Sequence, residues 1–372
     1  MKRLILLGGG HAHVHVLEAL GREPIPDCEV VLVSPFERQI YSGMLPGWIA
    51  GHYTIEACAL SLPQLASRAG VRFVHAAGES LDADGHQLTC NDGSRLDFDL
   101  LSIDTGSRSR IETIAGATEH ALPVRPIETF ISGVEALLAR CREARDQPVA
   151  IIGGGVAAVE LAFAIHHRLS REGHSRVALQ VIGDAGLPLD GLASSLQWKC
   201  LELLNERGIH WHAGSRVVEL TGQHAVLDDG TRIPAGHALL VTGAGASDWP
   251  RASGLAVDDA GFIRVASSLE SISHRGIFAA GDIAAYADPR PKSGVYAVRA
   301  GPPLAANLRR AAQGEPLAAW KPQRRALYLI ATGDRHALGA WGPFGWWGDW
   351  VWRWKDRIDR AFMRRFGNPH VG

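Results

Sequence analysis

Two glycine runs in the sequence have the residue types and spacing that bind phosphate groups. The first lies in LILLGGGHAHVHVL, residues 4–17, and the second in PVAIIGGGVAAVELAFAIH, residues 148–166. In both, a short apolar run typical of a buried parallel strand meets three glycines and then a pattern with helical spacing. Such a turn lets backbone N–H groups reach a pyrophosphate, and the positive end of the helix faces the same anion. One such run is a weak sign, but two well-separated copies indicate that one chain binds two nucleotides.

The first run departs from the usual dinucleotide fingerprint in two places. Gly8 and Gly10 stand where a tight turn needs them, but His13 stands where the last glycine normally allows close packing of helix and strand. Either the helix shifts outward or the imidazole itself contacts the ligand. The second strand ends in Ser34 where an acid would bind a ribose, and Glu37 follows three residues later. The candidate cofactor contacts in this region therefore include His11, His13 and Ser34.

The histidine cluster at the first run also raises the question of a metal site. His11, His13 and His15 are two residues apart, so they do not share one helix face. No cluster of acids or cysteines stands beside them in the sequence. We predict no metal.

Composition narrows the class of protein. The 372 residues suffice for two domains, and 38 Lys and Arg against 39 Asp and Glu leave no basic field for nucleic acid. The five cysteines are scattered without a CxxC pair, which indicates reduced thiols in the cytoplasm. The first apolar run is too short for a signal peptide, and no run is long enough to span a bilayer. We expect a cytoplasmic protein that is either soluble or binds a membrane from the side, at its inner face.

The rest of the chain alternates strand and helix patterns. This predicts an α/β fold with two Rossmann-like dinucleotide-binding domains and a C-terminal helical tail rich in Trp and Arg. A helix with Gly and Pro near its start is expected over residues 294–314. Further strands are expected over residues 28–34, 99–107, 176–183, 237–245 and 275–284.

The order of the glycine motifs resembles a known family. The motifs are GGG at 8–10, TG at 105–106 and 242–243, GGGVAAVE at 153–160 and IFAAGD at 277–282. In this order the chain resembles the pyridine nucleotide-disulfide oxidoreductase superfamily, and within it the type II NADH dehydrogenase-like branch. Three longer segments look like the flavoprotein group sometimes fused ahead of selenide, water dikinase; they are residues 41–53, 292–309 and 350–363.

The resemblance implies that FAD binds at the first glycine run. Gly8 and Gly10 would hold its pyrophosphate, and Asp282 would hydrogen-bond the ribityl chain. The helix beginning near Val295 would point its N-terminus at the flavin, where reduced flavin carries negative charge. The other implied cofactor contacts in the Thr-Gly and Gly-Asp motifs are Thr105, Gly106, Gly243 and Gly281.

The resemblance also implies NAD(P)H at the second run. Gly153 and Gly155 would bind this nucleotide, with Glu160 at the acidic position that follows the turn in the superfamily. The second strand of this unit ends in Gly183, and Asp184 comes one place after the position of a ribose-binding acid. The choice between NADH and NADPH therefore stays open. The implied boundaries are 1–115 with 245–314 for the FAD domain, 116–244 for the NAD(P)H domain and 315–372 for the C-terminal region.

Cysteines are missing where disulfide reductases carry their redox pair. The segment after the second strand reads YSGMLPG, residues 41–47, without a CxxxxC motif. Dithiol chemistry of that kind is therefore excluded. Cys141 and Cys200 could trap sulfur only if the fold brings them to the flavin.

The C-terminal segment WGPFGWWGDWVWRWKDRIDRAFMRRF, residues 341–366, holds six of the eleven tryptophans. At helical spacing, one stripe would contain Trp347, Trp350, Val351, Trp354, Ile358, Ala361 and Phe362. Trp and Arg on an amphipathic helix suit a membrane interface, where a flavoenzyme can reach quinone dissolved in lipid. The alternative is a helix that packs on the chain's own domains or on the second subunit of a homodimer.

These observations lead to one prediction and two alternatives. We predict an FAD-dependent oxidoreductase that passes hydride from NAD(P)H to the flavin and on to a quinone or another small acceptor. The side chains expected nearest the flavin are Lys292, Tyr41 and Arg299. One alternative keeps FAD but acts on sulfur or selenium compounds linked to selenophosphate synthesis. The other is a degenerate flavoprotein that serves as a non-enzymatic binding module.

Overall fold

A five-stranded parallel sheet forms the framework of the first half of the molecule. The computed structural model describes residues 1–143 and 147–367. The strand order is β21-β9-β1-β2-β5, and every pairing is parallel. The strands are β1 (Lys2–Leu7), β2 (Cys28–Ser34), β5 (Arg72–His75), β9 (Leu100–Ile103) and β21 (Ile277–Ala279).

A second five-stranded parallel sheet repeats this arrangement, in the order β11-β18-β12-β13-β14. Its strands are β11 (Ala121–Pro123), β12 (Val149–Ile152), β13 (Leu179–Ile182), β14 (Ile209–His212) and β18 (His237–Leu240). In each sheet the chain winds outward from the strand before the glycine run and later returns to that strand's other side. The strand order thus reverses beside β1 and β12, where doubly wound sheets bind ligands. The predicted α/β class with two Rossmann-like sheets is confirmed.

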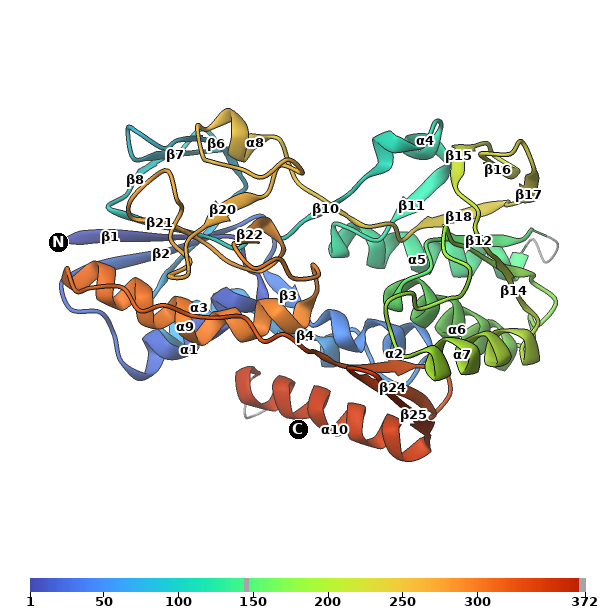
Figure 1. Ribbon diagram of the computed structural model, residues 1–372. Coiled ribbons are helices and arrows are strands. Elements are labelled where there is room, and N and C mark those ends of the chain that lie inside the picture. Colours follow the sequence, from blue (N-terminus) through green and yellow to red (C-terminus); the bar gives the residue numbers. More distant parts are fainter. Residues whose placement is uncertain (144–146, 368–372) are drawn as a thin grey trace.

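Helices pack on the first sheet from one side, and a short antiparallel ribbon lies on the other (Figure 1). The helices are α1 (His11–Arg22), α3 (Leu62–Arg68) and α9 (Gly294–Gln313), and the ribbon is β6 (Gly78–Asp82), β7 (Gln87–Cys90) and β8 (Arg95–Asp97). Gly301 allows α9 to approach α1, because a Cβ there would lie 2.6 Å from the Cβ of His15. Seven of the twelve residues of α1 are buried, since the helix is covered by the sheet and by α9.

The second sheet has its own helices and its own ribbon. They are α5 (Ile127–Glu143), α6 (Val156–Arg171), α7 (Ser194–Glu206), β15 (Val217–Leu220), β16 (His224–Leu227) and β17 (Arg232–Pro234). Two chain crossings join the halves, where β10 (Arg108–Ser109) pairs antiparallel with β19 (Ala244–Gly245). The shorter elements are β3 (Arg38–Ile40), β4 (Ala59–Ser61), β20 (Ile263–Val265), β22 (Ala284–Tyr286), α2 (Leu45–Ile49), α4 (Ala117–His120) and α8 (Trp249–Ala252).

The strands before the two Thr-Gly turns are shorter than the sequence pattern predicts. The strand expected over 99–107 is β9, which ends at Ile103, and the one expected over 237–245 is β18, which ends at Leu240. The apolar run stops at Ile103 in the first and at Val241 in the second, and the chain leaves the sheet as it enters the Thr-Gly turn. These turns therefore belong to the ligand-facing edge and not to the strands.

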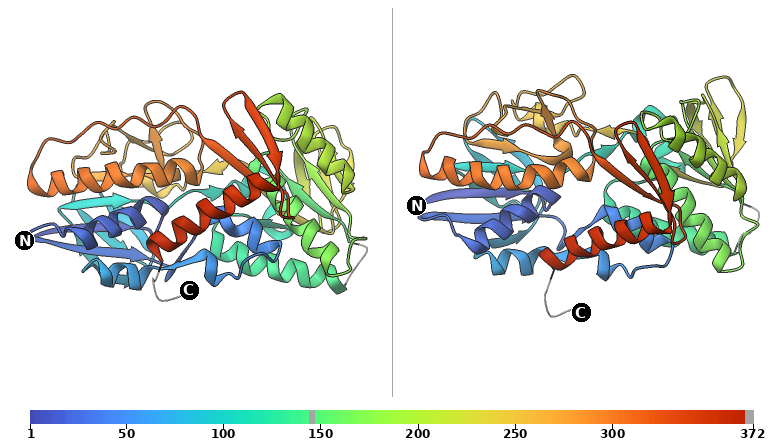
Figure 2. Two further views of the ribbon diagram at one scale, coloured as in Figure 1. Left: turned by 90° about the horizontal axis from the view of Figure 1, so that it is seen from below. Right: turned by 60° about the horizontal axis from the view of Figure 1, so that its bottom comes forward.

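The C-terminal region is not wholly helical. An antiparallel sheet of β23 (Leu327–Ala331), β24 (Ala337–Trp341) and β25 (Phe344–Gly348) comes first, and α10 (Asp349–Phe366) follows it. Figure 2 shows α10 running beneath both halves of the molecule. Arg365 pairs with Glu18 of α1 at 2.8 Å, and the hydroxyl of Tyr53 donates to Asp356 at 2.6 Å. The chain's own domains therefore cover one face of this helix.

Candidate functional site

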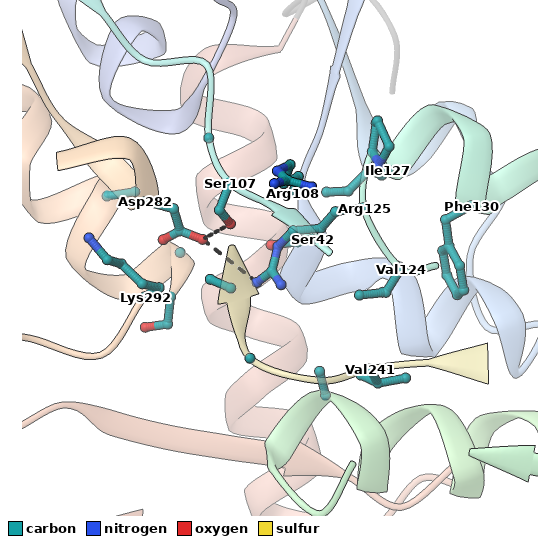
Figure 3. A pocket seen from close by; sticks show the side chains of 18 of the residues that line it. Ser42, Ser107, Arg108, Val124, Arg125, Ile127, Phe130, Val241, Asp282 and Lys292 are labelled. Carbon is teal, nitrogen blue, oxygen red and sulfur yellow. Dashed lines mark hydrogen bonds and ion pairs between the residues drawn. The ribbon is translucent and has the colours of Figure 1, made fainter. Parts of the chain in front are cut away.

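A cavity of about 1380 Å³ joins the carboxyl ends of the two sheets. Both glycine runs and both Thr-Gly turns line it. Figure 3 shows its middle part, where side chains from the two halves point toward one another. Its volume exceeds that of a pocket for one small ligand, which is roughly 300–1,000 Å³. The arrangement can hold two extended ligands in one continuous space.

The first glycine run makes a tight turn directly against the Thr-Gly turn that follows β9. Gly8 has φ of +95°, and a Cβ there would lie 2.5 Å from the carbonyl oxygen of Asp104. The N–H of Gly10 donates to the same oxygen at 3.2 Å. Only glycine fits this crossing, because both the backbone conformation and the close approach exclude a side chain.

His13 supports this turn from below and does not line the cavity. Its Nδ1 donates to the carbonyl oxygen of Gly8 at 2.6 Å, which leaves Nε2 to accept from the Ser102 hydroxyl at 2.8 Å. The ring is fully buried, and burial lowers its pKa to about 4, so it is neutral. The imidazole therefore holds α1 against the turn. It fills the space between helix and strand at the position where the usual fingerprint has its last glycine.

The second glycine run has the same backbone design. Gly153 has φ of +134°, and a Cβ there would lie 2.5 Å from the carbonyl oxygen of Val241. Gly155 is the N-cap of α6 and has open space around its Cα. The Thr242 hydroxyl, next in the chain, is buried without a hydrogen-bond partner in the described chain. A donor or acceptor on a bound ligand would satisfy it.

An ion cluster spans the two halves in the middle of the cavity (Figure 3). The Asp282 carboxylate accepts from the Ser107 hydroxyl at 3.1 Å and lies 3.6 Å from the Arg125 guanidinium. Lys292 lies nearby over the Phe262 ring, 3.9 Å from its centroid, and donates to the carbonyl oxygen of Ala284 at 2.5 Å. Burial lowers the pKa of Lys292 to about 8. This ammonium group can therefore lose its proton near neutral pH.

A second buried cluster lies where α6 and α10 meet the cavity. Lys355 donates to Asp359 at 2.7 Å and to the carbonyl oxygen of Gly43 at 2.5 Å. Glu160 accepts the N–H of Ala331 at 2.8 Å, and its burial raises its pKa to about 7 although Lys355 opposes the shift. Glu160 and Lys355 both line the cavity. A carboxyl group with this pKa can hold or release a proton at the cavity wall.

Most of the residues singled out from the sequence line this cavity. They are Gly8, Gly10, His11, Ser34, Thr105, Gly106, Gly153, Gly155, Glu160, Gly243, Asp282, Lys292 and Val295. Four others do not: His13 lies beneath the first turn, and Gly281 packs against Asp104. Tyr41 turns away to stack on Phe362 of α10, with ring centroids 4.3 Å apart.

Arg299 is the fourth residue outside the cavity. It lies in a separate groove with His15, Trp320 and Arg365, because position 299 comes more than one helical turn after the N-terminal end of α9 at Gly294. Its expected place nearest the flavin is therefore not supported.

The cysteines lie away from the cavity. Cys58, Cys141 and Cys200 are fully buried in the hydrophobic core, and burial raises the pKa of each thiol. None of them lines the cavity. The fold does not bring Cys141 or Cys200 to the place where sulfur trapping would need them.

The aromatic stripe predicted in the tail divides between two faces. Trp347 lies in β25 and not in the helix, because the chain folds into a hairpin before α10 begins. Val351 is fully buried, whereas Trp350, Trp354 and Ile358 are 50%, 37% and 40% exposed. The buried face carries Val351, Lys355, Asp359 and Phe366.

The cavity residues that were not singled out from the sequence include Asp104, Arg125 and Lys355. Arg125 stands in no recognisable motif, and Lys355 lies within the 350–363 segment without a role that the sequence indicates, so only the fold places them at the cavity. Asp104 had a signal, because an acid directly before the Thr-Gly motif is unusual at the end of a buried apolar strand.

The part of the chain that matches a known family includes nearly all the residues that line the cavity. The family described as pyridine nucleotide-disulphide oxidoreductase matches residues 2–301. The internal alternative NAD(P)H-ubiquinone oxidoreductase A1 of Arabidopsis thaliana mitochondria is 24% identical over 324 residues, which are 78% of this chain and 62% of that protein. The chain thus spans about three fifths of the length of that relative.

Solved structures share the fold at low identity. The sulfide:quinone oxidoreductase of Aquifex aeolicus superposes with a TM-score of 0.83 at 18% identity and covers 98% of this chain and 91% of its own. The structure of NDH2 from Plasmodium falciparum in complex with NADH has a TM-score of 0.80 at 12% identity and covers 100% of both chains.

Proposed function

Since the chain belongs to the pyridine nucleotide-disulphide oxidoreductase family, we propose that it is an FAD-dependent enzyme that oxidises NAD(P)H and reduces a quinone or another small acceptor. The observation that carries this proposal is the pair of glycine turns opening on one cavity. The Arabidopsis relative, named for NAD(P)H and ubiquinone, supports this donor and acceptor class.

The residues at the first turn fit FAD. Gly8, Gly9 and Gly10 line the cavity with backbone, so a pyrophosphate can approach the turn closely. The N-terminus of α9 opens on the same space, and the hydroxyl of its N-cap Ser293 is buried without a partner in the described residues. Asp282 and Lys292 provide a hydrogen-bond acceptor and a cation beside them. We assign residues 1–115 with 245–314 to FAD binding.

The residues at the second turn fit a nicotinamide dinucleotide. The first-turn N–H groups of α6 have no acceptor among the described residues, so they are free for a pyrophosphate. Asp184 and Arg216 line the far end of the cavity, where the adenosine half of the ligand would lie. We assign residues 116–244 to NAD(P)H binding and 315–372 to the C-terminal region.

FAD, when bound, supplies the two-electron transfer between the donor and the acceptor. The protein orients both nucleotides, with their phosphates at the N-termini of α1 and α6. Glu160 and Lys355 face the cavity and can deliver protons, which a quinone needs in order to become a quinol.

The exposed face of α10 provides a way to a lipid-dissolved acceptor. Trp350, Trp354 and Ile358 continue the exposed aromatic surface of the β24-β25 hairpin, which includes Trp341 and Phe344. Aromatic and arginine side chains on one amphipathic surface favour a membrane interface. In the part of the chain that the structure describes, no helix is long and apolar enough to cross a bilayer. We therefore include peripheral membrane binding in the proposal.

The first experiment is an anaerobic titration of the FAD-bound protein with NADH and then NADPH, following the visible flavin band. Rapid bleaching by one of them, followed by recovery on addition of a soluble quinone, is expected. A yellow protein that stays oxidised with both would overturn the dehydrogenase proposal. A protein that takes up no FAD would point to a non-enzymatic binding module.

Membrane binding has its own test, flotation with liposomes that contain anionic lipid. A variant with Trp350→Ser, Trp354→Ser and Ile358→Ser keeps the buried face of α10 and should float several-fold less than the wild type. If both float equally, the exposed face has another role. A shift from dimer to monomer in the variant would then assign that face to a homodimer interface.

A further inference from the structure

A buried carboxyl group stands at the N-terminus of α1, beside the place proposed for the FAD pyrophosphate. Asp104 is only 2% exposed. One of its oxygens, Oδ2, accepts the N–H of Ala12 at 2.8 Å and the N–H of His13 at 3.0 Å. Its backbone carbonyl accepts the N–H of Gly10. Asp104 thus accepts hydrogen bonds from some of the N–H groups that the N-terminus of a helix offers to a phosphate in a dinucleotide-binding fold.

The Asp104 carboxyl group also joins two separate FAD-binding motifs. A Cβ on Gly10 would overlap it, and a Cβ on Gly281 would lie 2.5 Å from its Oδ1. The glycine run and the Gly281–Asp282 turn therefore close around this one side chain. At the corresponding position of the second unit stands Val241, which has no polar side chain.

No cation neutralises the Asp104 carboxyl group. Among the described residues, it takes part in no salt bridge, and the groups that face it are neutral or negative. From η4 (Gly281–Ile283), Asp282 adds negative charge, and from β22 the Tyr286 hydroxyl is buried without a partner. From α1, His11 and His13 are neutral because burial lowers their pKa values to about 4.

Two cations that line the same cavity interact with Asp282 instead. Arg125 lies 3.6 Å from the Asp282 carboxylate, and the charge of Lys292 interacts with that same group. Burial raises the pKa of Asp104 to about 7, although the N–H groups of His13 and Ala12 oppose the shift. A doubly charged pyrophosphate added here would repel a second anion, since the buried Asp104 carboxyl group has little water around it to screen the charge.

We propose that Asp104 carries a proton whenever FAD is bound, so that FAD binding takes up one proton and weakens as pH rises. The inference rests on the proposed binding of FAD at the first glycine run. Asp104 is a positioning residue in this account, because it holds the turn through Ala12 and His13 in both protonation states. In its protonated state, Oδ1–H is a hydrogen-bond donor at the edge of the pyrophosphate site.

The test is a titration of FAD-free protein with FAD at pH 6, 7, 8 and 8.5, followed by the quenching of flavin fluorescence. The wild-type dissociation constant should rise toward tenfold per pH unit above pH 7. Asp104→Asn keeps the acceptor for Ala12 and His13 but cannot ionise, so its affinity should be nearly constant and should exceed that of the wild type at pH 8.5. Asp84→Asn is the matched control, because the Asp84 side chain is 97% exposed and does not line the cavity, and it should keep the pH slope.

A second measurement needs no variant. Calorimetry of FAD binding to the wild type at pH 8, in two buffers with different ionisation enthalpies, should report uptake of about one proton per FAD. Uptake near zero, or an unchanged pH slope in Asp104→Asn, would overturn the inference while leaving FAD binding intact. Failure to bind FAD at any pH would instead overturn the proposed function.

Discussion

The two glycine turns of this protein have the same backbone arrangement, but different side chains pack behind them. At Gly8 and at Gly153, an added Cβ would lie 2.5 Å from a backbone carbonyl oxygen. Behind the first turn stand His13 and Asp104, and in the corresponding places of the second stand Ala158 and Val241. The backbone fixes where a phosphate can lie, but the side chains decide how much of the helix N-terminus is left for it.

The difference separates two kinds of binding site. In the second unit the first-turn amides of α6 have no acceptor in the described chain and await the ligand. In the first unit the Asp104 carboxyl group and the His13 ring hold the turn before any ligand arrives. A preformed turn suits a cofactor that stays bound, and open amides suit a co-substrate that leaves after each turnover.

The largest expected effects come from adding a side chain at the glycine of each turn that lies against a carbonyl oxygen. Gly8→Ala and Gly153→Ala both place a side chain at positive φ and against a carbonyl oxygen. We expect Gly8→Ala to lose FAD, and Gly153→Ala to keep FAD but bind NAD(P)H at least about 100-fold more weakly, near 3 kcal/mol. Flavin absorbance and NADH titration measure the two effects.

Gly173→Ala is the matched control for backbone strain. Gly173 has φ of +81° with open space around it, far from either turn. It should cost roughly 1 kcal/mol of folding stability and leave both affinities unchanged. Equal loss of both nucleotides in Gly8→Ala and Gly153→Ala would show that the turns do not act separately.

The next prediction concerns the side chains that support each helix. His13→Ala leaves a cavity and two unsatisfied groups, the carbonyl of Gly8 and the hydroxyl of Ser102. We expect a loss of about 2–4 kcal/mol in the free energy of unfolding. Ala158→Gly should cost only about 1 kcal/mol, because it removes one methyl group from a helix. Urea denaturation of the two variants compares them, and equal losses would contradict the supporting role of His13.

A carboxylate can be introduced where the second turn lacks one. Val241→Asp places an acid at the position that corresponds to Asp104 and next to the free amides of α6. We expect NADH to bind about 10- to 100-fold more weakly, or 1.4–2.8 kcal/mol, because the new anion competes for those amides. Val241→Leu is the control for shape, because its side chain is close to Asp in size but accepts no hydrogen bond, and its affinity should stay within about threefold of the wild type. Equal weakening by both changes would assign the effect to packing.

The smallest expected effect is on the pH dependence of folding. Because the pKa of Asp104 is raised to about 7, the folded protein holds a proton there that the unfolded chain has lost above pH 5. This contribution to stability is complete at low pH and is lost as pH rises through 7. For FAD-free protein we expect Asp104→Asn to lose about 1 kcal/mol less stability than the wild type between pH 6 and pH 8. Identical pH profiles in urea denaturation would show that Asp104 ionises normally.

Much of the site could be predicted from the sequence because its signals are local. Gly8, Gly10, Gly153 and Gly155 stand at fixed spacing from an apolar strand, and strand-to-helix turns of this kind have few backbone solutions. The lining residues of the later motifs, such as Asp282, follow from their place in that order. The prediction that placed Trp347 on the helical stripe was wrong for the same reason. Local spacing cannot show that residue 347 belongs to a hairpin that comes before the helix.

Sequence alone determined that this chain has two dinucleotide turns on parallel strands, because backbone geometry and hydrophobic patterning are written in neighbouring residues. Only the tertiary structure decided which side chains meet at those turns. His13 is hydrogen-bonded to Ser102, and Asp104 to Ala12, although about ninety residues of chain separate the members of each pair. Lys355 reaches the cavity from the last helix. Their partners and burial depend on how distant strands and helices pack, and so do their charges, because a pKa follows from the surroundings of a group and not from its place in the sequence.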